Sequence, residues 1–352
     1  MLLTIVIFLI ILSVLVLAHE FGHFGTAKLF GVKVEEFGLG YPPRIFGFKK
    51  GETIYSLNAI PFGGFTKMLG EEDPKYPGSL ASKSHGARFL ILSAGSIMNI
   101  LLPILFLSIS LMIPHDVRLE KVQIEEVAQE SPAQQAGIEA GDIILKIDNQ
   151  TIKNRGDVGY RIQLKLGSEV DILLQKADAS QKEVSVAPRW NPPEGQGATG
   201  IMITGVDSTL SRESYPFWEA IPLGARKCWE ILTLFRNEVV GWFIKGTSPQ
   251  FTGPVGIAQL TGEVAKSGVS SLLEFASLIS ISLGIFNLFP FPGLDGGRLV
   301  FVVLEWVRRG KRIPPQKEGM VHLIGFAMLI TLILVVTYFD VLRLIQGGNI
   351  LP

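Results

Sequence analysis

Cysteine is nearly absent from this sequence, because Cys228 is the single one among 352 residues. A lone cysteine cannot form an internal disulfide, so folding does not depend on oxidation. A net charge is absent as well, since 32 lysine and arginine residues balance 32 aspartate and glutamate residues. The composition therefore gives no reason to expect a nucleic acid as a partner.

Charged residues are missing from four long stretches of the sequence, at residues 1–18, 89–114, 275–294 and 323–339. A helix crosses the hydrocarbon core of a bilayer, about 30 Å thick, with roughly 20 apolar residues. The hydrophobic content of 47% is also high for a soluble protein. The sequence therefore predicts an α-helical integral membrane protein with four transmembrane helices. Because no lysine or arginine precedes His19, we expect the first stretch to remain as a span and not to be cleaved as a secretion signal.

The loop between the third and fourth spans is basic, and this sets the expected orientation. Cytoplasmic loops of membrane proteins are enriched in lysine and arginine. With four spans, residues 31–85 then face the cytoplasm as well, whereas residues 115–270 and both termini face the other side. The basic residues of the loop are Arg308, Arg309, Lys311, Arg312 and Lys317.

The segment between the second and third spans carries the signature of a small peptide-binding domain. Short apolar runs alternate with turns from Leu119 to about Arg189, and residues 131–148 read SPAQQAGIEAGDIILKID. That stretch resembles the signature of a PDZ domain, in which a short helix leads through a glycine turn into a strand. A PDZ domain binds an extended peptide as an added strand, so the resemblance implies a polypeptide ligand. A small β-rich domain without a ligand is the alternative.

Residues 217–245 differ from the four spans, because apolar and charged residues are interleaved along them. Trp229 and Phe235, for example, lie among Glu230 and Arg236. This pattern predicts an amphipathic helix that lies on the membrane or on the protein.

Together these patterns predict four transmembrane helices, a membrane-associated β-element, and an inserted α+β PDZ domain on the extracytoplasmic side. The expected regions are the first span (1–30), the cytoplasmic-side β-region (31–85), the second span (86–114), the PDZ domain (115–205), an amphipathic helix with a connecting segment (206–269), the third span (270–304), a basic loop (305–320), and the fourth span with the C-terminal tail (321–352).

The first span ends in His19-Glu20-Phe21-Gly22-His23. Two histidines four residues apart share one face of a helix, so both imidazoles can reach one zinc ion while Glu20 stays close to a metal-bound water. The same pattern also occurs by accident in soluble helices. Here a charged group costs on the order of 2–3 kcal/mol near the bilayer centre, and less near its edge, unless it has a partner such as a metal ion. The motif therefore predicts part of a site for one zinc ion per chain.

The third ligand is expected at the same membrane depth as His19. If Leu2 lies at the outer interface, a helix rising 1.5 Å per residue places His19 about 26 Å further, near the cytoplasmic edge of the core. The third span ends close to that edge in Asn287-Leu288-Phe289-Pro290-Phe291-Pro292-Gly293-Leu294-Asp295. Its two prolines break the helix, which a bilayer tolerates only where the backbone is buried in protein or lines a cavity. Asp295 is the predicted third ligand, and a helix cap at the water boundary is the alternative.

With these motifs, nearly the whole chain resembles the site-2 proteases, and within them the bacterial regulator of sigma-E protease type. The resemblance implies His19, His23 and Asp295 as zinc ligands and Glu20 as the catalytic base. Gly95-Ser96-Ile97-Met98-Asn99 resembles the family's Gly-x-x-x-Asn element, although serine stands where proline is common. One PDZ signature is present where the best-known relatives carry two in tandem.

The resemblance also implies a substrate-binding group. Val34 to Gly40 and Thr53 to Leu69 alternate like strands, and they include Pro61-Phe62-Gly63-Gly64-Phe65. In the family, the matching β-element presents an edge to unwound substrate, and a cytoplasmic hairpin without that role is the alternative. The residues predicted to contact substrate are Gly63, Gly64, Asn99 and Asn287, the last of which is otherwise a polar cap at the helix break.

The predicted function is intramembrane proteolysis by a zinc metalloprotease in a bacterial cytoplasmic (inner) membrane, with the active site near the cytoplasmic face. Kinship implies that its substrates are single-span membrane proteins already trimmed outside, such as anti-sigma factors or remnant signal peptides. A non-catalytic membrane scaffold whose PDZ domain captures peptides is the main alternative. A metal transporter would need ligands spaced through the membrane depth, which the expected position of Asp295 disfavours.

Overall fold

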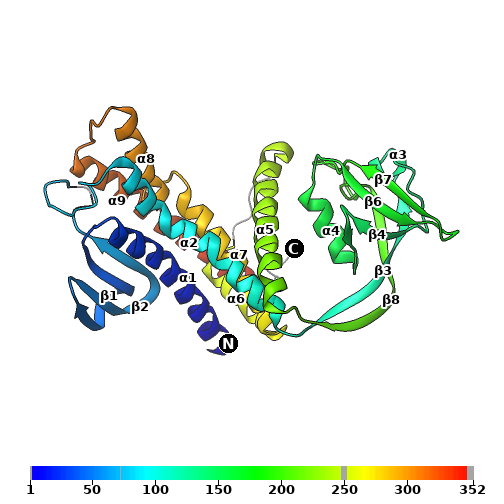
Figure 1. Ribbon diagram of the computed structural model, residues 1–352, viewed down its shortest axis with the longest axis horizontal. Coiled ribbons are helices and arrows are strands. Elements are labelled where there is room, and N and C mark those ends of the chain that lie inside the picture. Colours follow the sequence, from blue (N-terminus) through cyan, green and yellow to red (C-terminus); the bar gives the residue numbers. More distant parts are fainter. Residues whose placement is uncertain (1, 72, 247–251, 347–352) are drawn as a thin grey trace. The chain divides into compact units, whose positions relative to one another are not determined.

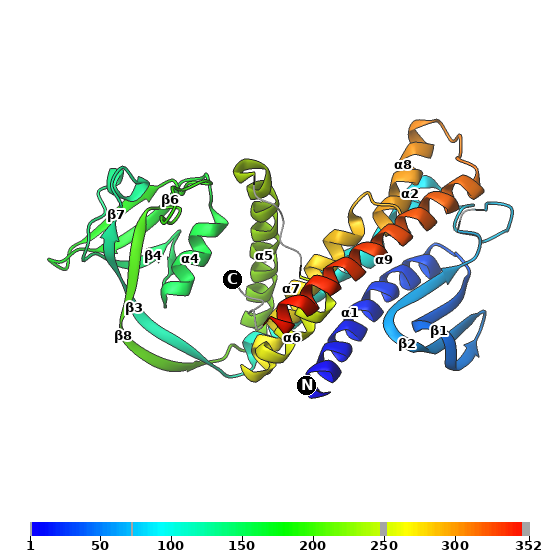
Figure 2. The same ribbon diagram turned by 180° about the vertical axis from the view of Figure 1, so that it is seen from behind.

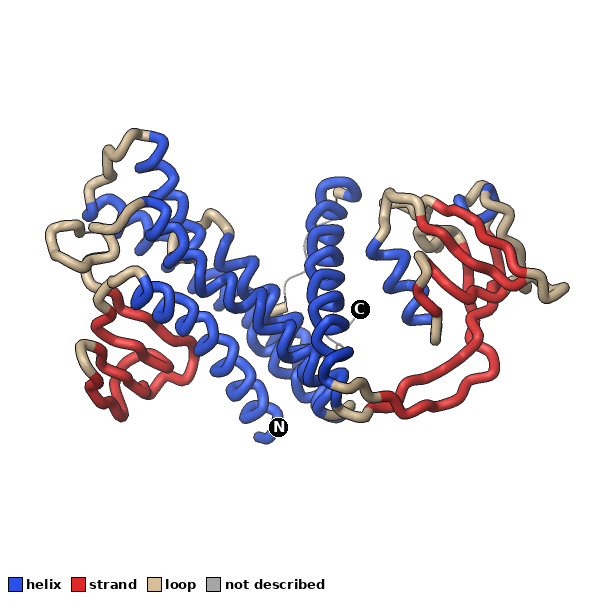
Figure 3. Tube along the Cα trace, in the orientation of Figure 1, coloured by secondary structure: helices blue, strands red, loops and turns tan. Residues whose placement is uncertain are grey.

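The computed structural model describes residues 2–71, 73–246 and 252–346, so the predicted C-terminal tail and part of the connecting segment before the third span lie outside the described residues. The chain divides into two compact units. A membrane unit comprises residues 1–110 and 251–352, and an inserted unit comprises residues 111–250. Figure 3 shows that most of the membrane unit is helical and that the inserted unit contains both strands and helices.

The membrane unit is built on four helices that are long and apolar enough to cross a bilayer. This number agrees with the four charge-free stretches of the sequence. Two shorter helices join them. The six are α1 (Leu2–Leu29), α2 (His85–Met112), α6 (Pro254–Lys266), α7 (Val269–Leu288), α8 (Asp295–Val307) and α9 (Pro315–Ile345), and the four candidate spans are α1, α2, α7 and α9.

Small residues set how closely these helices approach one another. A Cβ atom on Gly22 of α1 would overlap the carbonyl of Ala94 in α2, and a Cβ on Gly284 of α7 would lie 2.9 Å from the carbonyl of Ser96. Serines then form hydrogen bonds between helices, as Ser280 Oγ does in donating to the carbonyl of Asn99 over 2.7 Å. Such packing is expected where lipid is as apolar as the side chains and hydrophobicity cannot drive helices together.

Two elements differ from the sequence prediction. The predicted third span (270–304) is two helices, because α7 ends at Leu288 and α8 begins at Asp295 after a turn that contains both prolines. The prolines lack the amide hydrogens that a continuous helix needs. Helix α6 was not predicted within the connecting segment, because its 13 residues are too short to stand out as a span.

The structure explains the Gly253-Pro254-Val255-Gly256 segment at the start of α6. The carboxylate of Asp340 in α9 is 1% exposed and accepts a hydrogen bond from the Gly256 N–H over 2.9 Å. A Cβ atom on Gly253 would lie 2.6 Å from the same oxygen. Glycine therefore makes room for a carboxylate that caps the N-terminus of α6, where unpaired N–H groups favour an anion.

Strands β1 (Val34–Lys50) and β2 (Thr53–Met68) lie beside α1 in the membrane unit (Figures 1 and 2). Phe37 of β1 pairs with Thr66 on one side and with Tyr55 on the other, so β2 folds around the first half of β1. The segment Gly64–Met68, called here the edge segment, therefore has β1 on one side only within this sheet. Its other side faces a cavity that residues of α1 and α8 also line.

The inserted unit contains an antiparallel sheet with the strand order β7-β6-β4-β3-β8, and β5 pairs with β4. Its core is a cluster of buried aliphatic side chains, including Ile144, Ile172 and Leu174. Its elements are β3 (His115–Val127), α3 (Pro132–Gln135), β4 (Ile143–Ile147), β5 (Gln150–Thr151), α4 (Arg155–Leu164), β6 (Val170–Gln175), β7 (Gln181–Val186), β8 (Ile201–Glu213) and α5 (Phe217–Lys245).

The helix, glycine turn and strand of the predicted signature are present as α3, Gly137 and β4. Ser131 caps α3 by accepting from the Gln134 N–H, and Gly137 and Gly141 take positive φ angles of 76° and 95° that favour glycine. The predicted domain boundary at residue 205 falls inside β8, which continues to Glu213 because it pairs with β3 along its whole length.

Helix α5 has the bounds expected for the amphipathic helix, and it packs against α4. The Asn237 side chain donates to the carbonyls of Gln163 and Leu164, the last two residues of α4, over 2.8 and 3.2 Å. Glu230 accepts hydrogen bonds from Tyr160 and Arg161 of α4. Glu230 and Asn237 of α5 are therefore bound to protein.

Candidate metal centre and catalytic site

Helix α1 and the start of α8 bring three metal-ligand types together. His19 Nε2 and His23 Nε2 are 3.2 Å apart, and Asp295 Oδ2 lies 3.0 Å from the first and 3.1 Å from the second. Both histidines are buried, and Asp295 is half-buried. Within residues 2–71, 73–246 and 252–346, this is the one group of three or more such side chains that could hold a metal ion.

The donor atoms fit a tetrahedral zinc site. Zinc bound at about 2.0–2.1 Å holds neighbouring ligand atoms roughly 3.3 Å apart, which is close to the separations found among the three side chains. Two imidazoles and one carboxylate are also a ligand set typical of catalytic zinc, with a fourth position left for water. The residues present therefore fit the metal that the motif predicts.

The tautomer of His23 is set by its other ring nitrogen. His23 Nδ1 lies 2.8 Å from the backbone carbonyl of Ile91 in α2, and a carbonyl can only accept. The Nδ1 atom therefore carries the proton, and the lone pair of Nε2 points at the metal centre. Such a second hydrogen bond is the usual way in which a ligating histidine is oriented.

Helix α2 explains the Gly-x-x-x-Asn element. A Cβ atom on Gly95 would overlap His23 Nε2 and would lie 2.8 Å from His19 Cε1, so only glycine leaves room for both imidazoles. One turn later, the side-chain amide of the fully buried Asn99 lies 3.5 Å from His19 Nδ1. Turning that amide by 180° would bring its oxygen, which has no hydrogen-bond partner among the described residues, beside the Nδ1–H that a zinc-binding His19 needs.

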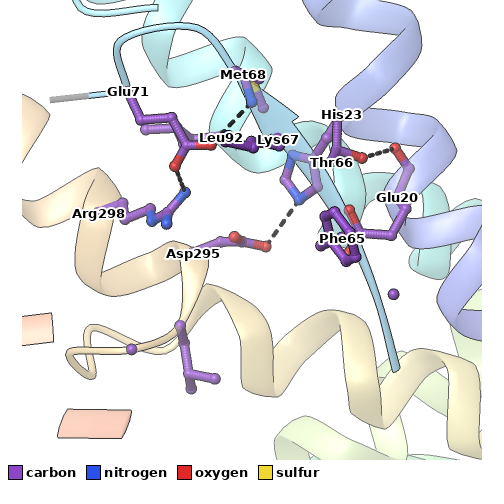
Figure 4. A pocket seen from close by; sticks show the side chains of 13 residues that line it. Glu20, His23, Phe65, Thr66, Lys67, Met68, Glu71, Leu92, Asp295 and Arg298 are labelled. Carbon is purple, nitrogen blue, oxygen red and sulfur yellow. Dashed lines mark hydrogen bonds and ion pairs between the residues drawn. The ribbon is translucent and has the colours of Figure 1, made fainter. Parts of the chain in front are cut away.

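A cavity of about 290 Å³ adjoins this centre. Figure 4 shows His23 and Asp295 on one side of it and the β2 strand crossing in front. The edge segment contributes all five of its residues to the lining, and Glu20 of α1 lines it too. The full lining is Glu20, His23, Gly64, Phe65, Thr66, Lys67, Met68, Glu71, Leu92, Gly293, Leu294, Asp295 and Arg298.

The edge segment is fixed against α1 at Glu20. Thr66 Oγ1 donates to the backbone carbonyl of Glu20 over 3.0 Å, and a Cβ atom on Gly64 would lie 3.2 Å from Glu20 Cγ. Burial, together with the charge of Glu20, raises the pKa of the Tyr41 phenol on β1. The Glu20 side chain thus lies beside the strand edge that lines the cavity.

An ion pair lines the cavity near the end of β2. Glu71 accepts from the Met68 N–H through one oxygen, and Arg298 Nη1 lies 2.8 Å from the other (Figure 4). Arg298 is three residues after Asp295, so both side chains leave the same face of α8. Sequence reasoning did not identify Glu71, Arg298 or Thr66, although the spacing of Arg298 from Asp295 was a usable signal.

The structure brings five of the predicted site residues together at the cavity and the metal centre, and the other three do not line the cavity. Glu20, His23, Asp295 and Gly64 line the cavity, and His19 completes the metal centre. Gly63, Asn99 and Asn287 are not among the described residues that line it. Gly63 has a φ of 91° and abuts the Tyr41 ring, and Asn287 is half-buried one residue before the end of α7.

The sequence matches the model of peptidase family M50 over residues 7–332. It is 36% identical over 339 residues to a candidate zinc metalloprotease of Clostridium acetobutylicum, covering 96% of this chain and 97% of that protein. Zinc metalloprotease RasP of Oceanobacillus iheyensis is 30% identical over 430 aligned positions, covering 97% of this chain and 99% of the relative. The regulator of sigma-W protease RasP of Bacillus subtilis is 29% identical, with the same coverage.

A solved structure is also similar to part of the chain. The PDZ domain of an SdrC-like protein from Listeria monocytogenes is 25% identical and covers 25% of this chain and 90% of that domain, with a TM-score of 0.22.

Proposed function

The chain belongs to peptidase family M50, and on that premise we propose that it hydrolyses peptide bonds within or near the transmembrane segments of single-span proteins already trimmed outside the membrane. Membership makes it a zinc metalloprotease of the site-2 protease family. The observation that carries the proposal is the cavity in which Glu20, the metal centre and the edge segment meet. A strand edge can hold an extended peptide by backbone hydrogen bonds, and a peptide must be unwound before its carbonyl can be attacked.

The residues of this chain divide the chemistry among them. His19, His23 and Asp295 would hold a zinc ion, which supplies a Lewis acid and lowers the pKa of a bound water toward 7. Glu20 accepts the proton of the attacking water and then passes it to the leaving amine. The Ile91 carbonyl keeps His23 in the ligating tautomer, and the edge segment aligns the scissile peptide beside Glu20. We assign Gly64 to this alignment, and we propose that Gly63 and Asn287 contact substrate further from the metal centre.

Anti-sigma factors and remnant signal peptides are the substrate classes that we propose. The B. subtilis relative is named as a regulator of a sigma factor, which supports the first class. We further propose that the enzyme lies in a bacterial cytoplasmic membrane with its active site near the cytoplasmic face. In this arrangement the inserted unit is an extracytoplasmic PDZ domain that receives peptide or excludes untrimmed substrates.

Replacing Glu20 by Gln tests the catalytic proposal. The purified full chain in proteoliposomes is given a single-span substrate in two forms, with and without its extracytoplasmic domain. Wild type should cleave the trimmed form, and the Glu20→Gln variant should cleave it about 10²- to 10⁴-fold more slowly, because a positioned general base contributes that much. Zinc content should stay at one per chain in both proteins.

A Glu125→Gln variant is the matched control, because Glu125 is an exposed residue of β3 in the inserted unit. It should cleave like wild type. Undiminished cleavage by Glu20→Gln would remove Glu20 from the mechanism. Peptide binding by the inserted unit with no cleavage by any variant would instead support the scaffold function.

A further inference from the structure

Helix α9 has 31 residues, and only Gly325 and Asp340 are buried among those that the structure describes. Large apolar residues along it, such as Leu332 and Leu334, are exposed as expected for a surface that faces lipid. The helix is therefore attached to the rest of the membrane unit at a few defined points. Asp340 is the attachment to α6, and Gly325 lies 15 residues earlier, about 22 Å along the helix.

The attachment at Gly325 is to the turn that carries the third metal ligand. A Cβ atom on Gly325 would overlap the backbone carbonyl of Pro292, three residues before Asp295. Gly293 has a φ of 98°, and a Cβ atom there would lie 2.9 Å from the backbone nitrogen of Phe326. Two glycines, one on each side, thus allow the backbone of the turn to lie directly on the backbone of α9.

A side chain of α9 completes the contact. His322 Nδ1 accepts a hydrogen bond from the Gly293 N–H over 3.1 Å, and the His322 ring packs on Phe301 of α8 with ring centroids 5.2 Å apart. The accepting role requires Nδ1 to be unprotonated, which places the ring proton on Nε2. His322 Nε2 is buried and has no hydrogen-bond partner in the described structure. Such an unsatisfied donor costs free energy, so the Nε2 end of His322 does not stabilise the contact and its Nδ1 end makes the hydrogen bond.

We propose that His322 is a positioning residue for the metal centre, and that His322 and Gly325 of α9 hold the Pro292-Gly293 turn so that Asp295 reaches both histidines. Metal ligation is sensitive to the position of this turn, because Asp295 must place one oxygen about 3 Å from two nitrogens on another helix. Asp295 is the first residue of α8, and Leu294 before it makes no side-chain cap, so the turn leads directly into the residue that carries the carboxylate. The inference rests on the proposed metal site and adds α9 to the elements that build it.

The test measures zinc affinity in the Glu20→Gln background, by competition of the full chain in detergent with a chelator. That background does not depend on whether the protein cleaves a substrate, so failure of this inference and failure of the proposed function are distinguishable. His322→Phe keeps the size of the ring but removes the acceptor, and it should lower zinc affinity roughly 10-fold, the low end of the effect of losing an outer contact to a ligand. His322→Asn places an acceptor oxygen near the position of Nδ1 and should stay within about 3-fold of the parent.

Gly325→Ala should lower zinc affinity at least as much as His322→Phe, because its methyl group would displace the Pro292 carbonyl. Leu323→Phe, at an exposed neighbouring position of α9, is the matched control and should change nothing. In the otherwise wild-type enzyme, excess zinc should restore most of the kcat of His322→Phe, with KM unchanged, which a misfolded protein would not show.

Unchanged zinc affinity in both His322→Phe and Gly325→Ala would overturn the proposal. Equal losses in His322→Phe and His322→Asn would overturn the role of the acceptor. If His322→Phe does not accumulate in the membrane, unchanged zinc affinity in Gly325→Ala alone overturns the proposal.

Discussion

In the inserted unit the buried side chains are mostly aliphatic, whereas in the membrane unit many of the buried side chains are small or polar. Ile144, Ile172 and Leu174 fill the first interior, and serines, Asn99, Asp340 and the two histidines occupy much of the second. The large apolar residues of α9 lie outside. The difference shows that hydrophobic residues mark the surface that avoids water, and this surface is internal in one unit and faces lipid in the other.

The polar groups buried in the membrane unit matter for function. Polar groups in a membrane interior are costly unless they are paired, so they gather where chemistry or a fixed geometry requires them. In the membrane unit they form the metal centre, the Asp340 cap on α6, and a cluster around Glu305 at the end of α8. Changes to such groups and to aliphatic residues should therefore act differently in the two units.

The largest effect is expected at Glu305, which is 7% exposed and pairs with Arg88 and Arg312. Removing one partner of a buried ion pair costs about 3–5 kcal/mol, so Glu305→Ala should lower the thermal stability of the membrane unit by that order. Burial alone would raise the pKa of Glu305, but hydrogen bonds from Arg88 and Arg312 lower it overall. Its stabilising contribution is therefore present above the unfolded pKa and is lost as the pH falls through the lower folded pKa.

Thermal unfolding of the full chain in detergent, recorded between pH 7 and pH 3, measures this effect. Wild type should lose stability with falling pH, and Glu305→Ala should lose less. If Glu305→Ala were as stable as wild type at pH 7, the ion pairs of Glu305 would not stabilise the membrane unit.

The next prediction compares the stability lost when a buried apolar residue and an exposed one are truncated. Ile172→Ala in the fully buried core of the inserted unit should cost about 2–5 kcal/mol, because it leaves a cavity. Leu334→Ala on α9 removes a similar side chain from an exposed position and should change stability by no more than about 0.5 kcal/mol. Hydrogen exchange of residues 143–186 and of α9 in the full chain distinguishes the two. Equal loss of protection in both variants would contradict the claim that the buried residue stabilises the protein more than the exposed one.

A single methyl group should damage the metal centre. Gly95→Ala would overlap His23 Nε2, and we expect zinc affinity to fall about 100-fold, which corresponds to about 2.7 kcal/mol. Gly86→Ala on the same helix, where a Cβ meets nothing within 4 Å, is the control and should bind zinc like wild type. Chelator competition measures both affinities, and similar values in the two variants would show that Gly95 is not needed for space.

The smallest effect concerns a polar group that the inserted unit buries. Asp142 is 2% exposed, and Lys176 Nζ donates to it over 2.9 Å. Lys176→Met would leave that carboxylate with one donor fewer and should cost about 1–3 kcal/mol. The hydrogen bond to Asp142 raises the pKa of Lys176, so the contribution is complete below the unfolded lysine pKa and is lost as the pH rises through the raised folded value.

Denaturant unfolding followed by the near-ultraviolet signal of the inserted unit, compared at pH 7 and pH 11, tests this. The difference between wild type and Lys176→Met should shrink at the higher pH. A difference that grows with pH would assign the effect to something other than the lysine charge.

Much of the fold could be predicted because its signals are local. The four spans follow from missing charge, the bounds of α5 from its interleaved charges, and the α3 to β4 connection from Gly137 and Gly141. The prediction was wrong for the boundary at residue 205, whereas the break that the two prolines predicted in the third span separates α7 from α8. It also missed α6, whose 13 residues are too few to stand out as a span.

The sequence by itself determined that His19 and His23 share a helix face with Glu20 close by, since four residues make about one turn, and that Asp295 follows a span broken by two prolines. Only the tertiary structure decided that Gly95 makes room for the imidazoles, that the edge segment lies against Glu20, and that His322 and Gly325 hold the turn before Asp295. These contacts join residues far apart in the chain. No periodicity reports them, because they depend on how closely two backbones approach, and that distance is set by packing.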